Sequence, residues 1–420
     1  MANADRLRFL AKRLRERLWF RPLAVCVLSI SGVFVAETAD RTSLGASIPS
    51  ITTASIEALL SIMAASMLVI ATFAVASMVS AYSSASDSAT PRSFSLVIAD
   101  DVSQNALSTF VGAFIFSIVA LTALKNDFFQ EAGRAALFVL TALVFAMVIL
   151  TFVRWIDRIA RLGRLGNSVE KVEEATEAAL VRRRAAPALR GVPASRRLPQ
   201  GRAVCSTSVG YVQRVDVATL QAVAEGTDRW VAVAALPGTF AGPGCVLAYV
   251  GDEPDGSGEV DDSQVVDAFV IGRERLFDED PRFGLVVLSE IAGKALSPGI
   301  NDPGTAIAVI GSLVRLFALW SEPLEQPPTP EYDRVEVPEL SVQDMFDDAF
   351  TVIARDGAGS VEVAVRLQKA LRSLSSLEHP PIREAAMDHA RLALARAEKR
   401  LDLPEDLALV REVAAFARTA

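Results

Sequence analysis

Apolar residues are concentrated in the first 154 positions of this 420-residue chain, where they form four runs. The runs cover roughly residues 22–38, 55–82, 106–124 and 135–153. A bilayer needs about 20 apolar residues per helical span, so each run is close to that length or longer. The pattern predicts a four-helix transmembrane domain over residues 1–164. The basic start before the first run is also typical of a signal peptide, but three further apolar runs follow, which favours a first span.

Serine, threonine and glycine recur along the second and third runs, and no charged residue lies deep inside any run. Small and hydroxyl side chains favour close packing between membrane helices. The same residues are compatible with a polar pore lining, which we keep as the less favoured alternative. The lack of buried charge argues against a proton relay within a span.

Basic residues predict the orientation of the four spans. They cluster before the first run and after the fourth, and the two short loops 39–54 and 125–134 carry only Arg41, Lys125 and Arg134. The positive-inside rule therefore places both termini of this multi-pass membrane protein in the cytoplasm. Loop 83–105 would be cytoplasmic too. Three interpretations of its Pro91-Arg92 dipeptide stay open: part of a plain connecting loop, a contact with lipid headgroups, or a docking point for the soluble half.

The second half of the chain is polar, and its periodicity changes twice. Residues 165–200 predict a charged helical stalk followed by a proline-rich linker. Residues 201–320 alternate as strands and then show helical spacing, and residues 331–420 contain only helical patterns. The predicted fold class is thus a membrane α-helical domain with four transmembrane helices, plus a cytoplasmic α+β domain with a small β unit and a helical C-terminal bundle.

The stretch Ala295–Ala306, A-L-S-P-G-I-N-D-P-G-T-A, separates two segments with helical spacing. Asp302-Pro303 is a strong helix start, because the Asp side chain accepts from free amides and Pro suits the first helical position. The same pair occurs at Asp280-Pro281. The sequence therefore predicts helices over 281–296 and 303–320, joined by a tight corner.

This corner is the candidate ligand site of the sequence. The start of a helix is electropositive, and basic residues lie within a few turns, so a small anionic ligand is a candidate occupant. The candidate ligand-binding residues are Lys294, Ser297, Asn301, Asp302, Thr305 and Arg315. A purely structural corner is the favoured alternative, with Asp302 as the cap. Catalysis, with Asp302 as general base, is the least favoured, and no catalytic residue is assigned.

Composition narrows the function further. A net charge of −8 argues against a nucleic-acid partner. Phosphate-binding, nucleophile-elbow and zinc-protease motifs are absent, and the three cysteines lack metal-ligand spacing. The two histidines, His379 and His389, give little basis for a zinc site or a triad, and Asp344, Asp347 and Asp348 fit a solvated acidic face better than a cation site. No metal or cofactor is predicted, and an enzyme is disfavoured without being excluded.

The sequence resembles the bacterial predicted-membrane-protein family known as domain of unknown function 2254. The phrases that carry the resemblance are R-L-W-F, A-T-P-R-S-F, N-A-L-S-T-F-V-G-A-F, G-Y-V-Q-R-V-D-V, P-G-T-F and A-L-S-P-G-I-N-D-P-G-T-A. The chain departs from the family pattern at Gly304 and at positions 87–89, which affects local packing. The resemblance implies a membrane architecture and adds no reaction.

Two functions remain open at this point. The first is a homo-oligomeric channel or transport-related assembly with a cytoplasmic sensing or gating domain. The second is a membrane-anchored ligand-binding or regulatory protein without a pathway. A membrane-bound enzyme is the least favoured.

Overall fold

The computed structural model describes residues 20–38, 52–88, 90–92, 101–162, 165–194, 201–251, 261–324 and 329–418. The basic N-terminal arm and most of the acidic stretch 251–264 lie outside these ranges. The chain forms two compact units, one of residues 3–87 and 94–167 and one of residues 88–93 and 168–420.

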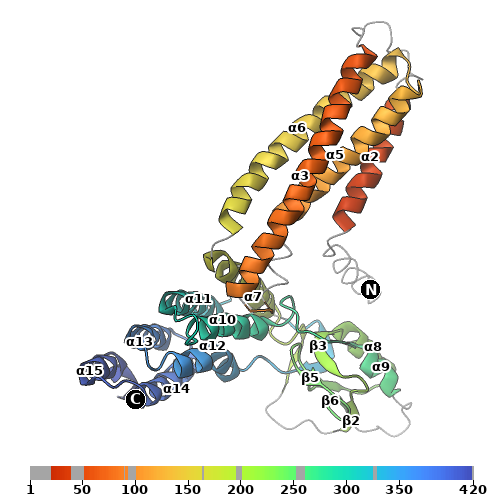
Figure 1. Ribbon diagram of the computed structural model, residues 1–420. Coiled ribbons are helices and arrows are strands. Elements are labelled where there is room, and N and C mark those ends of the chain that lie inside the picture. The colour runs from red at the N-terminus through yellow and green to blue at the C-terminus, as the bar shows by residue number, and fades with distance from the viewer. Residues whose placement is uncertain are drawn as a thin grey trace. The chain divides into compact units, whose positions relative to one another are not determined.

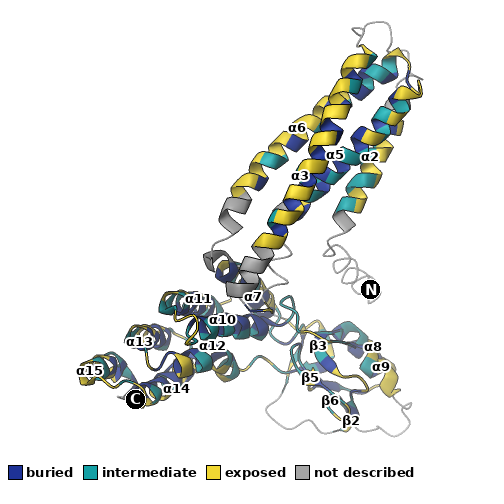
Figure 2. Cartoon of the chain, viewed as in Figure 1, coloured by how far each residue is buried: buried dark blue, intermediate teal, exposed yellow. Residues whose placement is uncertain are grey.

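The first unit is a bundle of four helices (Figure 1): α2 (Phe20–Thr38), α3 (Thr53–Ser88), α5 (Asp101–Lys125) and α6 (Glu131–Leu162). Its interior holds large apolar side chains such as Phe110, Phe116, Leu137 and Trp155. Outward positions are apolar as well, and many are exposed (Figure 2), for example Leu28, Val69 and Phe145. A helix that is apolar on all sides is suited to lipid rather than to water.

Four helices in the described part of the chain are long and apolar enough to cross a membrane: Thr53–Ser80, Gln104–Lys125, Glu131–Asp157 and Pro303–Ser321. The first three coincide with predicted spans. The first predicted span corresponds to α2, whose apolar part is shorter at Pro22–Val35. The segment Pro303–Ser321 is a helix of the second unit, α11, and its apolar residues form part of that unit's core.

Small residues bring the helices of the bundle together. A Cβ on Gly112 of α5 would lie 2.3 Å from Cγ1 of Val25 on α2, so only glycine allows this approach. Buried hydroxyls donate within their own helices: Ser108 to the carbonyl of Gln104, and Ser117 to that of Ala113, both at 2.7 Å. These contacts favour the packing interpretation of the small and hydroxyl residues.

The second unit contains two small sheets. The strands are β1 (Gly191–Pro193), β2 (Arg202–Cys205), β3 (Gly210–Val215), β4 (Val231–Val233), β5 (Phe240–Ala241), β6 (Val246–Val250), β7 (Phe269–Gly272) and β8 (Tyr332–Val337). One sheet has the order β1-β8-β4-β6-β2 and is mixed; the other is antiparallel with the order β5-β3-β7. Helices α8 (Val217–Gly226) and α9 (Asp262–Asp267) contribute Leu220 and Val265 to their shared core.

Two of these strands differ from the predicted organisation. β1 lies in the stretch predicted as a linker, and β8 lies in the stretch predicted as helical only. β8 pairs in parallel with both β1 and β4, so the sheet gathers segments from positions 191 to 337. Three-residue strands are too short to show an alternating pattern, which is why periodicity missed β1.

Helices form the rest of the second unit. They are α7 (Leu165–Ala185), α10 (Pro281–Ala295), α11 (Pro303–Ser321), α12 (Val342–Asp356), α13 (Val361–Ser375), α14 (Pro380–Ala397), α15 (Pro404–Val413) and the short η3 (Ala414–Arg418). Phe317 of α11 lies against Phe346 and Phe350 of α12, with ring centroids 4.3 and 5.7 Å away. The predicted fold class, membrane helices with a mixed α/β region and C-terminal helices, is confirmed.

Candidate functional site

The corner Ala295–Ala306 joins the end of α10 to the start of α11, as predicted. The amide of Asp302 donates to the carbonyl of Ala295, and the amide of Asn301 donates to the carbonyl of Ser297, both at 2.8 Å. Asn301 has a φ of 49°, in the left-handed region that asparagine tolerates better than most residues. The corner is therefore closed by its own backbone.

Asp302 is the N-cap of α11. Its carboxylate accepts from the hydroxyl of Thr305 at 2.6 Å and from the amide of Thr305 at 3.1 Å. These hydrogen bonds stabilise the ionised form and lower the pKa of Asp302 below its usual value. The structure thus joins two of the predicted site residues in a capping interaction, and the negative charge of Asp302 stands where an anionic ligand would bind.

Ser297 and Arg315, two other predicted site residues, bond to groups other than that carboxylate. The hydroxyl of Ser297 donates to the carbonyl of Lys294 at 2.7 Å. Arg315 forms a bidentate pair with Glu173 of α7, with N–O distances of 2.6 and 2.7 Å. Arg315 is ten residues beyond Thr305, about 15 Å along the helix axis, so it does not belong to the corner.

A second Asp-Pro helix start, Asp280-Pro281, lies in a different environment. Asp280 is 3% exposed, caps α10 through the amide of Phe283, and accepts from Arg275 at 2.7 and 3.1 Å. Gly238 has a φ of +94°, and a Cβ there would lie 2.3 Å from Oδ2 of Asp280. The P-G-T-F turn of the β region therefore sits directly on this carboxylate, which joins the sheets to α10.

Arg282, the second residue of α10, contacts two of the acidic residues that were weighed as a cation site. It donates to Asp348 at 2.6 Å and to Asp344 at 2.7 Å. Burial raises the pKa of Asp348 despite the attraction of Arg282. Within the described ranges, no group of three or more His, Cys, Asp or Glu side chains is arranged to hold a metal ion. These carboxylates hold α12 against α10.

The described residues of the loop after α3, 90–92, belong to the second unit. Arg92 donates to the carboxylate of Glu290 on α10, and Thr90 is buried. Lys294 lies one turn along α10 from Glu290, at the spacing of a local ion pair, and no sequence pattern indicates the long-range pair with Arg92. Of the three interpretations of Pro91-Arg92, the structure favours docking on the second unit.

The two histidines have separate structural positions. His379 caps α14, with its Nδ1 accepting from the amide of Ile382 at 3.4 Å. His389 is 2% exposed among Phe346 and Phe350, and its Nε2 lies 3.1 Å from Oδ1 of Asp347. Burial lowers the pKa of both histidines, which favours their neutral forms at pH 7.

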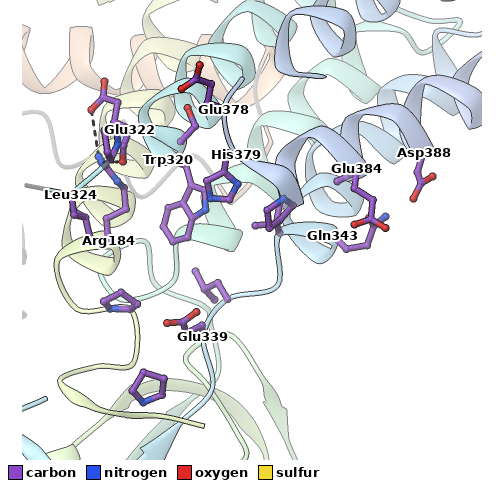
Figure 3. Close-up of a pocket in the computed structure, with 18 residues that line it drawn as sticks. Arg184, Trp320, Glu322, Leu324, Glu339, Gln343, Glu378, His379, Glu384 and Asp388 are labelled. Atoms are coloured by element: carbon purple, nitrogen blue, oxygen red, sulfur yellow. Dashed lines mark hydrogen bonds and ion pairs between the residues drawn. The ribbon is translucent and has the colours of Figure 1, made fainter. Parts of the chain in front are cut away.

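A pocket of about 1220 Å³ lies in the second unit (Figure 3). Its walls come from the end of α7, the segment after α11, the start of α12 and the start of α14. Trp320, Leu324 and several prolines form apolar surface, and His379 lies among them. Five carboxylates line the same pocket, namely those of Glu322, Glu339, Glu378, Glu384 and Asp388.

One guanidinium, that of Arg184, lines the pocket with these acids. It donates to the carbonyl of Glu322 at 2.6 Å and lies 3.5 Å from the carboxylate of the same residue. The pocket is therefore strongly negative. Sequence reasoning missed it because its walls are separated by up to two hundred positions. The proline-rich break after Trp320 is the one local signal, since it indicates an open end of α11.

A family model of predicted membrane proteins, designated DUF2254, matches residues 15–373. The chain belongs to this DUF2254 family. The match covers both units and confirms the resemblance derived from the sequence.

The curated relatives add no activity to the DUF2254 assignment. Uncharacterised proteins of Mycobacterium tuberculosis and Mycobacterium bovis are each 34% identical to the chain over 107 residues, which is 25% of this chain and 20% of each relative. The chain thus matches a fifth of the length of these curated relatives. No solved structure matches this DUF2254 protein.

Proposed function

We propose that this DUF2254 protein is a membrane-anchored ligand-binding regulatory protein. The observation that carries the proposal is the pocket of about 1220 Å³ in the second unit. Small-molecule sites are typically concave spaces of roughly 300–1,000 Å³ with apolar walls and a few polar groups. Because four separate segments form the walls, an occupant would bias how α7, α11, α12 and α14 are held together.

The first unit supports the role of anchor. Its described interior is filled by large side chains, including Phe110, Phe116 and Trp155, and the buried hydroxyls of Ser108 and Ser117 bond within their own helices. A polar passage through a single bundle would need open, unsatisfied polar positions along its axis. Its exposed apolar faces suit contact with the lipid bilayer.

The proposed orientation places the second unit in the cytoplasm of a bacterium, with the four helices of the bundle in the inner membrane. It rests on the basic residues that precede α2 and on those in and just after the last turns of α6. In this topology both termini are cytoplasmic, and the pocket samples cytoplasmic solutes.

Native mass spectrometry of the full-length protein, released from nanodiscs after purification from its own host, tests the proposal. We expect a bound small mass that a pocket-filling variant, Gln343→Trp, removes. The matched control is Gln264→Trp, an equally exposed glutamine on α9 outside the pocket. A spectrum without any adduct, or an adduct equally present in both variants, would contradict the proposal.

A homo-oligomeric channel or transport assembly is the second candidate, and one surface favours it. The exposed face of α3 carries small residues at intervals of three, four and seven positions, namely Ala54, Ala58, Ser61, Ala65, Thr72, Ala76 and Ser80. Such faces allow membrane helices to approach closely, so copies of the chain would meet along α3 and leave any pathway between them.

The oligomeric state in nanodiscs tests this alternative. The double variant Ala58→Leu/Ala65→Leu should disrupt assembly, whereas Ala142→Leu/Ala146→Leu on the exposed face of α6 should not. A ring that depends on α3, together with single-channel conductance, would replace the anchor proposal. The corner at Asp302 offers a weaker ligand site, because its own threonine occupies the carboxylate, and a membrane-bound enzyme stays the least supported alternative.

A further inference from the structure

We propose that the ligand of the acidic pocket is an extended organic polycation of the linear polyamine class. This inference rests on the proposed ligand-binding function and names the chemistry of its occupant. It is argued from the charges of the lining, their spacing, their hydrogen-bonding character and the apolar walls between them.

Three carboxylates of the pocket have no protein partner among the residues that the structure describes. Glu322 faces Arg184, and Asp388 accepts from Arg391. The side chains of Glu339, Glu378 and Glu384 form no ion pair or hydrogen bond there. Exposed surfaces usually intersperse both signs, so three unmatched carboxylates around one concavity favour a cationic occupant.

The placement of these carboxylates argues against a single metal ion. Glu339 precedes α12, Glu378 precedes α14, and Glu384 lies within α14 (Figure 3). The described residues include no convergent group of three potential metal ligands. An occupant that meets each carboxylate in turn must be long and carry several separated positive charges.

Hydrogen-bonding character matches a polyamine to the three unmatched carboxylates. Ionised carboxylates only accept hydrogen bonds, and ammonium groups only donate them. The guanidinium of Arg184 bonds to Glu322, so it does not compete for Glu339, Glu378 and Glu384. Each ammonium group of a polyamine can therefore donate to one of these three carboxylates, and the chain between the ammonium groups brings no carbonyl that needs a donor.

The apolar walls fit the methylene segments between the amines. Trp320 offers an aromatic face to a cation, and Pro187, Pro323 and Pro381 flank the acidic positions. His379 is neutral at pH 7 because burial lowers its pKa, so it adds no repulsion to a cation. Charge at the termini and apolar contact in between match a linear polyamine.

Hydrogen–deuterium exchange of the full-length protein in nanodiscs of zwitterionic lipid, with spermidine as the probe, tests the inference. We expect spermidine to slow exchange in segments 339–343 and 378–388. The variant Glu339→Gln/Glu378→Gln/Glu384→Gln should weaken this effect at least about tenfold, because each exposed charge pair contributes modestly. The matched control, Asp402→Asn/Glu405→Gln/Glu412→Gln, removes the same charge from exposed positions of the α15 region and should leave affinity within about twofold.

Three outcomes would overturn the inference. In the first, spermidine leaves exchange in both segments unchanged. In the second, the protection by spermidine weakens equally in the two triple variants. In the third, hexa-arginine protects the pocket segments from exchange and spermidine does not. The last outcome would identify a basic peptide. If spermidine fails while the mass adduct removed by Gln343→Trp persists, the pocket binds a ligand of another class. If neither the protection by spermidine nor the mass adduct is observed, both the polyamine inference and the proposed ligand-binding function are wrong.

Discussion

Asp280 and Asp302 begin the consecutive helices α10 and α11 with the same Asp-Pro pair, but the two carboxylates differ in burial and in hydrogen-bond partners. Asp280 is 3% exposed and bound by Arg275, whereas Asp302 is half-buried and bound by Thr305, three residues away. Both carboxylates accept from the amide of the third helical residue. The local motif therefore determines the cap, and a contact with a segment that is distant in sequence, the turn at Gly238, determines whether the same carboxylate also joins two layers of the structure.

The largest effect should come from Asp280→Ala. This variant removes a cap and leaves the guanidinium of Arg275, whose side chain is 20% exposed, without its bidentate partner. Breaking a buried ion pair typically costs about 3–5 kcal/mol. Native-state hydrogen exchange should show a loss of that order in the opening free energy of α10, and an unchanged α10 would show that the carboxylate is not a link between layers.

A smaller effect is expected from the glycines that face the two carboxylates. Gly238→Ala places a Cβ 2.3 Å from Oδ2 of Asp280 at a φ of +94°, so the carboxylate must move away from Arg275. We expect a loss of about 2–4 kcal/mol from strain and overpacking. A far-UV and near-UV circular dichroism melt of the detergent-solubilised protein measures it.

Gly304→Ala is the matched control for that variant. A Cβ there would lie 3.2 Å from Oδ1 of Asp302, a side chain with room to adjust, and alanine favours the helix by up to about 1 kcal/mol. Its melting temperature should stay within a few degrees of wild type or rise. Equal destabilisation by Gly238→Ala and Gly304→Ala would mean that the carboxylates of Asp280 and Asp302 are packed equally tightly.

The same contrast explains what sequence could and could not predict. Asp280 and Asp302 were identified as caps because capping needs only neighbours within three residues. Three of the four spans matched in length and composition for a similar local reason. The contact between Gly238 and Asp280 joins the β region to α10, and no local pattern encodes it.

The sites show the same limit more strongly. Lys294 and Arg315 were grouped with Asp302 because they share two helices, but a helix separates residues along its axis, and Arg315 bonds to Glu173 of α7 instead. The acidic pocket draws Glu339 and Glu384 from segments that only tertiary structure brings together. Patterns in a single sequence do not report which distant segments lie close together in space.

Asp302→Ala should cost about 1 kcal/mol in the opening free energy of α11, the usual value of a lost cap. Asp302→Asn keeps the accepting oxygen and should cost less than half as much, since asparagine caps as well as aspartate. Hydrogen exchange at the first amides of α11 measures both. If the two variants lose equally, the charge of Asp302 rather than its hydrogen bonds stabilises this helix.

The smallest effect is the dependence of that cap on pH. Hydrogen bonds from Thr305 lower the folded-state pKa of Asp302, so the unfolded chain binds a proton more readily. The resulting stability is fully present above the unfolded pKa of about 4 and is lost as pH falls through the lower folded value. Exchange at the start of α11, corrected for the pH dependence of intrinsic rates, should therefore separate wild type from Asp302→Asn at pH 6 and bring them closer towards pH 3. A constant difference across this range would show that the carboxylate is not held in its ionised form, and the distinction between an exposed cap and a layer-joining one would then rest on Asp280 alone.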